Sequence, residues 1–191
     1  MRSSSLAALF MCFVSSSVFA QWDLVNEESS VTYVSIKKSK VGENNSFTKI
    51  KGKINDTGEV EVSIDLSSVE TNIEIRNKRM KEILFNTARF AEATISGSVN
   101  LTRANNLEVG KAYTDSINLN LSLHGVSNKV NSTVIIIKLS DERLFITSLS
   151  PVLVNAGDYG LSEGVEKLRN IAKLPSISSV VPVTFSLTFK N

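Results

Sequence analysis

Apolar and polar residues alternate with a period of two over many short stretches of this chain. In the clearest stretch, Val60 to Leu66, four aliphatic residues alternate with Glu61, Ser63 and Asp65. Successive side chains of a strand point to opposite faces of its sheet, so this spacing predicts a strand with one apolar and one solvated face. A chain dominated by such strands must bury many apolar faces together.

The same alternation recurs along the chain and predicts eight strands. They run from Val31 to Ile36, Phe47 to Ile54, Val60 to Leu66, Thr94 to Leu101, Ile117 to Leu123, Val130 to Lys138, Arg143 to Leu149 and Val181 to Phe189. Asn72 to Phe85 and Leu161 to Leu174 instead show helical spacing, and Pro175 ends the second of these segments. The turn-forming residues Asn55 to Gly58 join two neighbouring strands, which favours antiparallel pairing.

These elements predict an all-β domain with two short amphipathic helices. Eight antiparallel strands with one apolar face can close into a barrel or form a sandwich, and the residues alone leave both architectures open. The chain has 191 residues with only three Pro and nine Gly, and it shows no repeat or internal linker, so we expect one compact domain.

Residues 1–20 have the pattern of a cleaved secretory signal peptide. Arg2 is followed by the apolar run Leu6 to Val14, and small residues precede Gln21. We therefore expect a soluble periplasmic domain over residues 21–191. The single cysteine, Cys12, lies inside the signal, so the mature chain has no residue for a disulfide or a thiolate metal site.

Charge and composition argue against several classes of function. The 21 basic and 19 acidic residues give a net charge of +2, too small to predict nucleic-acid binding. His124 is the only histidine, and its sequence neighbours offer no metal ligand or catalytic partner. We expect no enzyme, no metal and no cofactor, and one alternative stays open, a lipid-modifying hydrolase or isomerase that uses His124 as its base.

The predicted inner faces carry mostly Val, Ile and Leu, with few Phe. An eight-stranded barrel is either just filled by side chains or just wide enough for one ligand. A bore lined by these residues would accept an apolar guest, because each buried CH₂ contributes about 0.8 kcal/mol. The alternative is a filled core, in which case the chain would be an interaction module.

Two parts of the chain carry motifs of a known family. The first runs from Val60 to Met80, followed by Leu84-Phe85 and by Phe90 to Ile95, and the second comprises Leu121 to Ser127 and Asp158 to Gly160. Together they resemble the YceI-like family, and the match covers most of the chain after the signal peptide. The resemblance implies a lipocalin-like eight-stranded antiparallel barrel that holds a polyprenyl or quinone-like lipid in an elongated pocket. Asn77 stands where the family commonly has Asp.

We expect the ligand to contact residues of the matched elements and of the inner strand faces. These residues are Tyr33, Val62, Ile64, Leu66, Ile73, Arg76, Met80, Leu84, Phe85, Phe90, Ile95, Leu119, Leu121 and Phe185. Two interpretations of Arg76 stay open, a contact with a polar head group and a salt bridge or capping contact near the preceding loop. Transient contact with a membrane and pairing of two chains also stay open.

Overall fold

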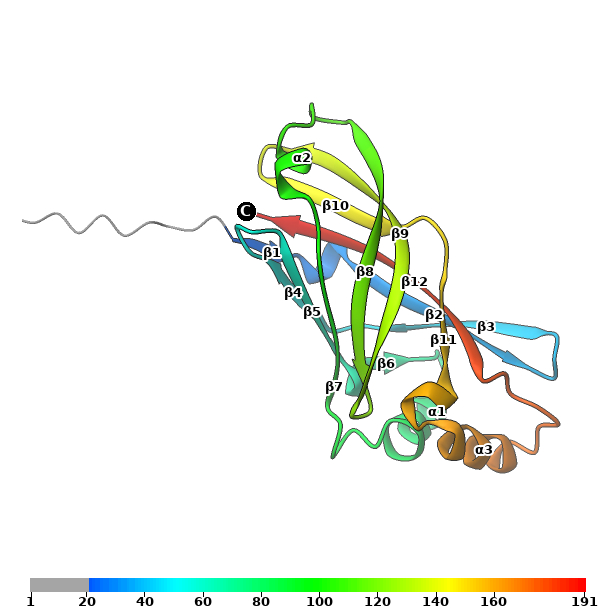
Figure 1. Ribbon diagram of the computed structural model, residues 1–191. Helices are drawn as coiled ribbons and strands as arrows, with labels where there is room; N and C mark the ends of the chain where they lie inside the picture. Colours follow the sequence, from blue (N-terminus) through cyan, green and yellow to red (C-terminus); the bar gives the residue numbers. More distant parts are fainter. Residues whose placement is uncertain (1–20) are drawn as a thin grey trace, which may run out of the picture.

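The computed structural model describes residues 21–191, so the predicted signal peptide lies outside the described residues. Within this range most of the chain is strand (Figure 1). The strands are β1 (Trp22–Leu24), β2 (Ser30–Lys37), β3 (Val41–Phe47), β4 (Ile50–Ile54), β5 (Glu59–Asp65), β6 (Val69–Glu70), β7 (Glu92–Ser98), β8 (Ala112–Leu123), β9 (Val126–Ser140), β10 (Arg143–Ser148), β11 (Val152–Asn155) and β12 (Val180–Lys190). The helices are α1 (Glu74–Arg79), which continues into a π-helical turn (Met80–Leu84), α2 (Leu101–Asn105) and α3 (Ser162–Ile171).

Eight strands form a closed antiparallel barrel in the order β1, β4, β5, β7, β8, β9, β10 and β12. β12 pairs with β10 along one edge and with β1 along the other, where Leu24 lies opposite Phe189. This last pairing closes the ring, and a closed ring leaves no unpaired strand edge. The predicted all-β barrel is confirmed, and the sandwich is excluded.

Four walls of this barrel each consist of two strands separated by a short interruption: β1/β2, β3/β4, β5/β6 and β10/β11. β12 is long enough to pair with both strands of each neighbouring wall. Its first half pairs with β11 and β2, and its second half pairs with β10 and β1. At one end the sheet therefore spreads, and β2 and β3 extend away from the barrel (Figure 1). β7, β8, β9 and β12 are the other four walls, and each of the eight predicted strands corresponds to one wall.

Two tight turns have the chemistry that their sequences indicate. Asn55 Oδ1 accepts hydrogen bonds from the backbone amides of Thr57 and Glu59, and Gly58 has a φ of +88°. Between β8 and β9, His124 and Gly125 have φ values of +53° and +81° and form a two-residue hairpin connection. The positive φ values of these two residues let the chain reverse between the long strands β8 and β9.

One expectation about an element boundary is wrong, and four strands were missed wholly or in part. The strand predicted from Thr94 to Leu101 ends at Ser98, because the Asn100 side chain accepts a hydrogen bond from the Arg103 amide and starts α2 at Leu101. The short strands β1, β6 and β11 were not predicted, since two to four residues are too few to show a period. Most of β3 was also not predicted, because its inner face is polar.

Both predicted helical segments are confirmed, as α1 with its π-helical turn and as α3. Gly164 within α3 packs closely on that turn, because a Cβ at this position would lie 3.0 Å from the carbonyl oxygen of Ile83. The lack of a side chain thus lets the two helical segments approach each other. None of the helices in residues 21–191 has the length and apolar character needed to cross a membrane.

The two ends of the barrel differ. Beside α2 the interior is packed with buried side chains from several elements, namely Trp22, Ile54, Leu101, Ala104, Tyr113 and Leu144. At the opposite end α1 and α3 lie together over the spread sheet (Figure 1), where the π-helical turn contacts α3. One end is therefore filled by side chains, and the other is covered by helices.

Gly58 and Gly110 offer a test of the turn between β4 and β5, because both have a positive φ but only Gly58 is crowded by neighbouring atoms. A Cβ at Gly58 would overlap the carbonyl oxygen of Val99, whereas none of the described atoms approaches within 4 Å of a Cβ at Gly110. We expect Gly110→Ala to lower the free energy of unfolding by about 1–2 kcal/mol, the cost of a left-handed backbone. Gly58→Ala should cost about 2 kcal/mol more, measured by urea denaturation. Equal losses for the two variants would contradict the placement of this turn.

Candidate functional site

An apolar cavity of about 200 Å³ lies inside the barrel. Eleven of the residues predicted to contact a ligand line it: Tyr33, Val62, Ile64, Leu66, Met80, Leu84, Phe85, Ile95, Leu119, Leu121 and Phe185. The other lining residues were not predicted from the sequence: Val31, Phe47, Val60, Ala93, Ser98, Val99, Ile117, Leu123, Val130, Ile146, Val152, Val154, Ala156, Leu161, Val165, Val181, Val183, Leu187 and Phe189. The core is therefore not filled, and ligand contact by these side chains stays a prediction.

The wall of the cavity is almost wholly hydrocarbon. Among the lining residues, only Tyr33 and Ser98 carry a side-chain hydroxyl. An engineered cavity of about 150 Å³ with a lining of Leu, Ile and Phe stays dry and binds benzene. The space here is thus large enough for a small apolar group as it stands, and a longer chain requires the walls to move apart.

The helical end of the cavity is formed by the π-helical turn, α3 and an aromatic row. Met80 and Leu84 reach the cavity from the turn, and Val165 reaches it from α3. The ring of Phe47 lies 5.5 Å from that of Tyr33 and 5.9 Å from that of Phe85, between ring centroids. π-helical turns are rare and occur frequently at functional sites.

Three residues predicted to contact the ligand do not line this cavity, and their contact with a ligand stays a prediction. Ile73 caps the start of α1 and is 44% exposed, because α1 turns that side chain to solvent. Phe90 packs against the ring of His124 at 4.2 Å between centroids, outside the cavity wall. Arg76 forms a salt bridge with Glu43 and also lies outside the cavity wall.

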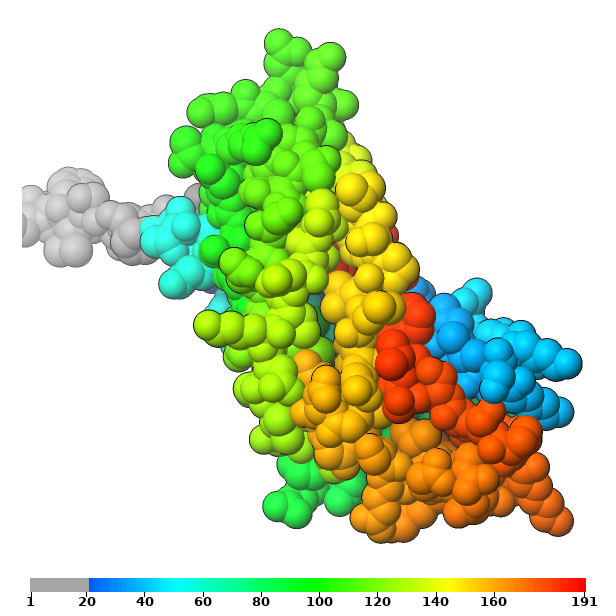
Figure 2. Space-filling view, turned by 45° about the vertical axis from the view of Figure 1, so that its right-hand side comes forward, coloured from blue at the N-terminus to red at the C-terminus, as the bar shows by residue number. Residues whose placement is uncertain are grey.

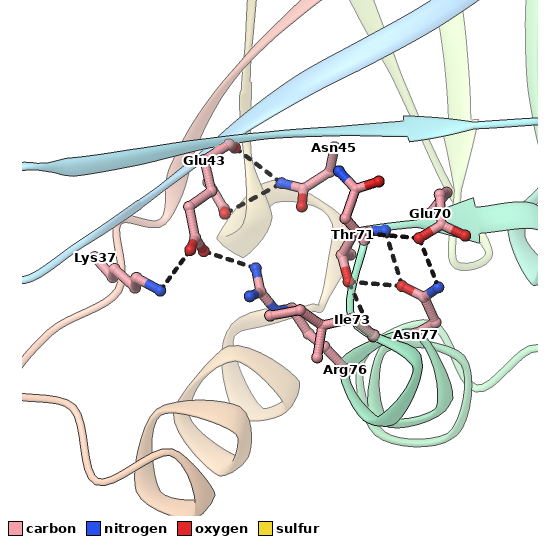
Figure 3. A network of polar contacts seen from close by, with 10 residues as sticks. Lys37, Glu43, Asn45, Glu70, Thr71, Ile73, Arg76 and Asn77 are labelled. Atoms are coloured by element: carbon pink, nitrogen blue, oxygen red, sulfur yellow. Dashed lines mark hydrogen bonds and ion pairs between the residues drawn. The ribbon is translucent and has the colours of Figure 1, made fainter.

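The contact of Arg76 is the salt bridge that the sequence left open. Its guanidinium lies 2.6 Å from Glu43 Oε2, and Lys37 Nζ lies 2.7 Å from Glu43 Oε1 (Figure 3). The hydrogen bond from Lys37, assisted by the charge of Arg76, lowers the pKa of Glu43 below its ordinary value despite partial desolvation. Glu43 therefore carries a negative charge that holds two cations at the helical end.

Asn77 has a structural task next to this ion pair. Its Oδ1 accepts hydrogen bonds from the backbone amide of Thr71 at 2.8 Å and from Thr71 Oγ1 at 2.6 Å (Figure 3). Its Nδ2 donates to Glu70 Oε1 at 2.9 Å, and this bond is the main cause of the lowered pKa of Glu70. An Asp here would place a second carboxylate against Glu70, so Asn fits this loop.

His124 lies in the turn between β8 and β9 and is absent from the residues that line the cavity. Its strained φ and its packing on Phe90 give it a role in the turn. Within residues 21–191, no cluster of three His, Cys, Asp or Glu side chains is arranged to hold a metal ion. The cavity has the chemistry of a binding site for an apolar molecule.

Some of the missed lining residues have a signal in the sequence. Val152 and Val154 alternate with Leu153, which is 65% exposed, but four residues are too few to predict a strand. Leu161 and Val165 have helical spacing, and only the tertiary fold places that helix over the barrel end.

The fold and the sequence match known proteins. A polyisoprenoid binding domain from Saccharophagus degradans, implicated in plant cell wall breakdown, is 38% identical and has a TM-score of 0.86, with 88% of this chain and 97% of that chain covered. BcnA of Burkholderia cenocepacia has 16% identity and a TM-score of 0.66, covering 86% and 98% of the two chains, and shows the same fold. A YCEI protein of Campylobacter jejuni has 12% identity and a TM-score of 0.55, covering 77% and 84%.

No sequence among the curated proteins matches this chain significantly. A YceI-like domain matches residues 22–189, which include every strand of the barrel wall from β1 to most of β12. This match agrees with the closed antiparallel barrel and with the 38% identical neighbour. The chain belongs to the YceI-like family.

Proposed function

We propose that this protein binds an isoprenoid-type lipid in its barrel cavity and sequesters it from water without converting it. The observation that carries the proposal is the hydrocarbon-lined cavity, which begins beneath the π-helical turn and α3 and ends at the packed side chains beside α2. Family membership supports it, as does the polyisoprenoid binding described for the 38% identical neighbour.

Apolar burial provides enough free energy for such binding. One branched five-carbon unit gains roughly 4 kcal/mol at about 0.8 kcal/mol per buried carbon, before ordering costs are subtracted. A cavity of about 200 Å³ must widen to take several units. The covering end is the part best suited to move, because α1, the π-helical turn and α3 lie outside the closed ring of strands.

The proposed location is the periplasm, and it rests on the signal-peptide pattern of residues 1–20 alone. A periplasmic protein that shields a lipid tail could store the lipid or carry it between membranes. The polyprenyl and quinone-like lipids share the same branched hydrocarbon tail, so the cavity wall accepts both.

Lipid extraction tests the proposal directly. We expect protein purified from its native cells, without detergent, to release a polyprenyl compound that mass spectrometry identifies in about equimolar amount. Protein that is recovered empty and also binds no added polyprenyl compound would contradict the proposed function.

A substitution that blocks the cavity tests where the lipid lies. Ala93 on β7 is buried and faces the cavity, whereas the next residue, Thr94, faces the opposite side of the sheet beside Ser63 and Ser122. We expect Ala93→Phe to weaken binding of a fluorescent polyprenyl probe by more than about tenfold, because the ring fills the cavity at an overpacking cost of about 1–3 kcal/mol.

Thr94→Phe is the matched control, with the same introduced ring on the outer face of the same strand. It should leave the probe affinity within about twofold of that of the unchanged protein. The cavity would be the wrong site if both variants bound the probe normally, or if only Thr94→Phe lost affinity.

A further inference from the structure

Two buried polar atoms at the helical end of the cavity lack hydrogen-bond partners among residues 21–191. They are the hydroxyl oxygen of Tyr33 and Oδ1 of Asn45. Tyr33 is 8% exposed and Asn45 is 4% exposed, so both side chains are more than nine-tenths buried. Buried polar groups are normally paired, and two unpaired ones in the same place point to an absent partner.

The strand register places these two residues opposite each other. Tyr33 on β2 is the direct cross-strand partner of Asn45 on β3, so their side chains project from the same face of the sheet. Tyr33 itself lines the cavity, and so does Phe47, the next residue of β3 on that face. The two unpaired atoms therefore belong to adjacent side chains on one face of the sheet and make no hydrogen bond with each other, although Asn45 itself lies outside the residues that line the cavity.

The orientation of the Asn45 amide is determined by its other contacts. Nδ2 donates to the backbone carbonyl oxygen of Glu43 at 3.0 Å and to Ser35 Oγ at 3.2 Å. A backbone carbonyl only accepts, so the nitrogen must face Glu43 and the unpaired atom must be the oxygen. Figure 3 shows this side chain between Glu43 and Thr71. Asn45 thus offers an acceptor, and the Tyr33 hydroxyl can donate or accept.

The charged side chains next to Tyr33 and Asn45 partly neutralise one another. Glu43 engages both Arg76 and Lys37, which leaves one net positive charge among the three side chains (Figure 3). The positive charge of Arg76 opposes the effect of burial on Tyr33, whose pKa is raised by desolvation, so the phenol stays protonated and able to donate. An anion placed here would meet the Glu43 carboxylate and the Asn45 oxygen.

We propose that Tyr33 and Asn45 form the seat for a neutral hydroxyl head group of the bound lipid, an inference that rests on the proposed function. The Tyr33 hydroxyl donates to the oxygen of the head group, and the head-group O–H donates to Asn45 Oδ1. A diphosphate or a quinone carbonyl can only accept, so either would leave Asn45 Oδ1 unpaired. A polyprenyl alcohol pairs both atoms, while its tail follows Phe47 and Phe85 into the cavity.

Binding of four related ligands tests this seat: geranylgeraniol, its methyl ether, geranylgeranyl diphosphate and the matching hydrocarbon without oxygen. We expect the alcohol to bind about three- to tenfold more tightly than the ether, which cannot donate to Asn45. Tyr33→Phe should weaken alcohol binding by about three- to tenfold and leave the hydrocarbon within about twofold.

Tyr113→Phe is the matched control, because the Tyr113 hydroxyl donates to the backbone oxygen of Asn100 at 3.2 Å near the packed end. It should preserve the order of the four affinities. The melting temperature gives a second readout: in the empty protein, Tyr33→Phe should raise it by about 2–4 °C, because an unpaired hydroxyl is removed, and Tyr113→Phe should lower it.

Each contrary outcome has a distinct meaning. Equal affinities for alcohol and hydrocarbon, or a lowered melting temperature of empty Tyr33→Phe, would overturn the seat and leave the proposed function intact. The tightest binding by the diphosphate, with an affinity that falls as salt rises, would replace the neutral head group with an anionic one. Failure of all four ligands to bind would overturn the proposed function together with the seat.

Discussion

Backbone pairing between β12 and β1 joins the last strand of the chain to the first and closes the sheet into a barrel. Closure converts a row of apolar strand faces into an enclosed interior, because the inner side chains then have no solvent-facing edge. Two residue pairs join β12 to β1, Asp23 with Lys190 and Leu24 with Phe189, and four more join β12 to β2, the other strand of the same wall. The cavity, its apolar lining and the two different ends of the barrel all depend on this closure.

The same strand, β12, also determines where the barrel opens. Its first half pairs with β2 and β11 in place of β1 and β10, so the wall spreads at this end and needs a cover. α3 and the π-helical turn provide that cover, and Gly164 permits their close packing. Figure 2 shows the α3 segment, in orange, against the strands at the base of the molecule. A covered end beside a hydrocarbon cavity is a suitable entry for a lipid tail.

The sequence predicts the walls of this barrel far better than its helical end. Alternation identifies β5 because Val62 and Ile64 point inward along a wall that is apolar throughout. It misses most of β3 because the inward positions there are Glu43 and Asn45, which are polar and half-buried or buried. The failure of the hydropathy pattern thus coincides with the proposed head-group seat, as expected where function competes with a uniform apolar face. Which partner Arg76 takes, and where Phe90 points, depend on tertiary contacts that no local pattern records.

The central claim is that the tail of a lipid lies inside the barrel, and isotope-filtered NOE spectra of unlabelled geranylgeraniol bound to methyl-labelled protein test it most directly. We predict NOEs from the methyl groups of the lipid to those of Val62, Leu119 and Ile146 on the cavity wall, and none to the exposed Leu153. NOEs confined to Leu153 and other exposed methyl groups would show that the lipid binds outside the barrel, in contradiction of this claim.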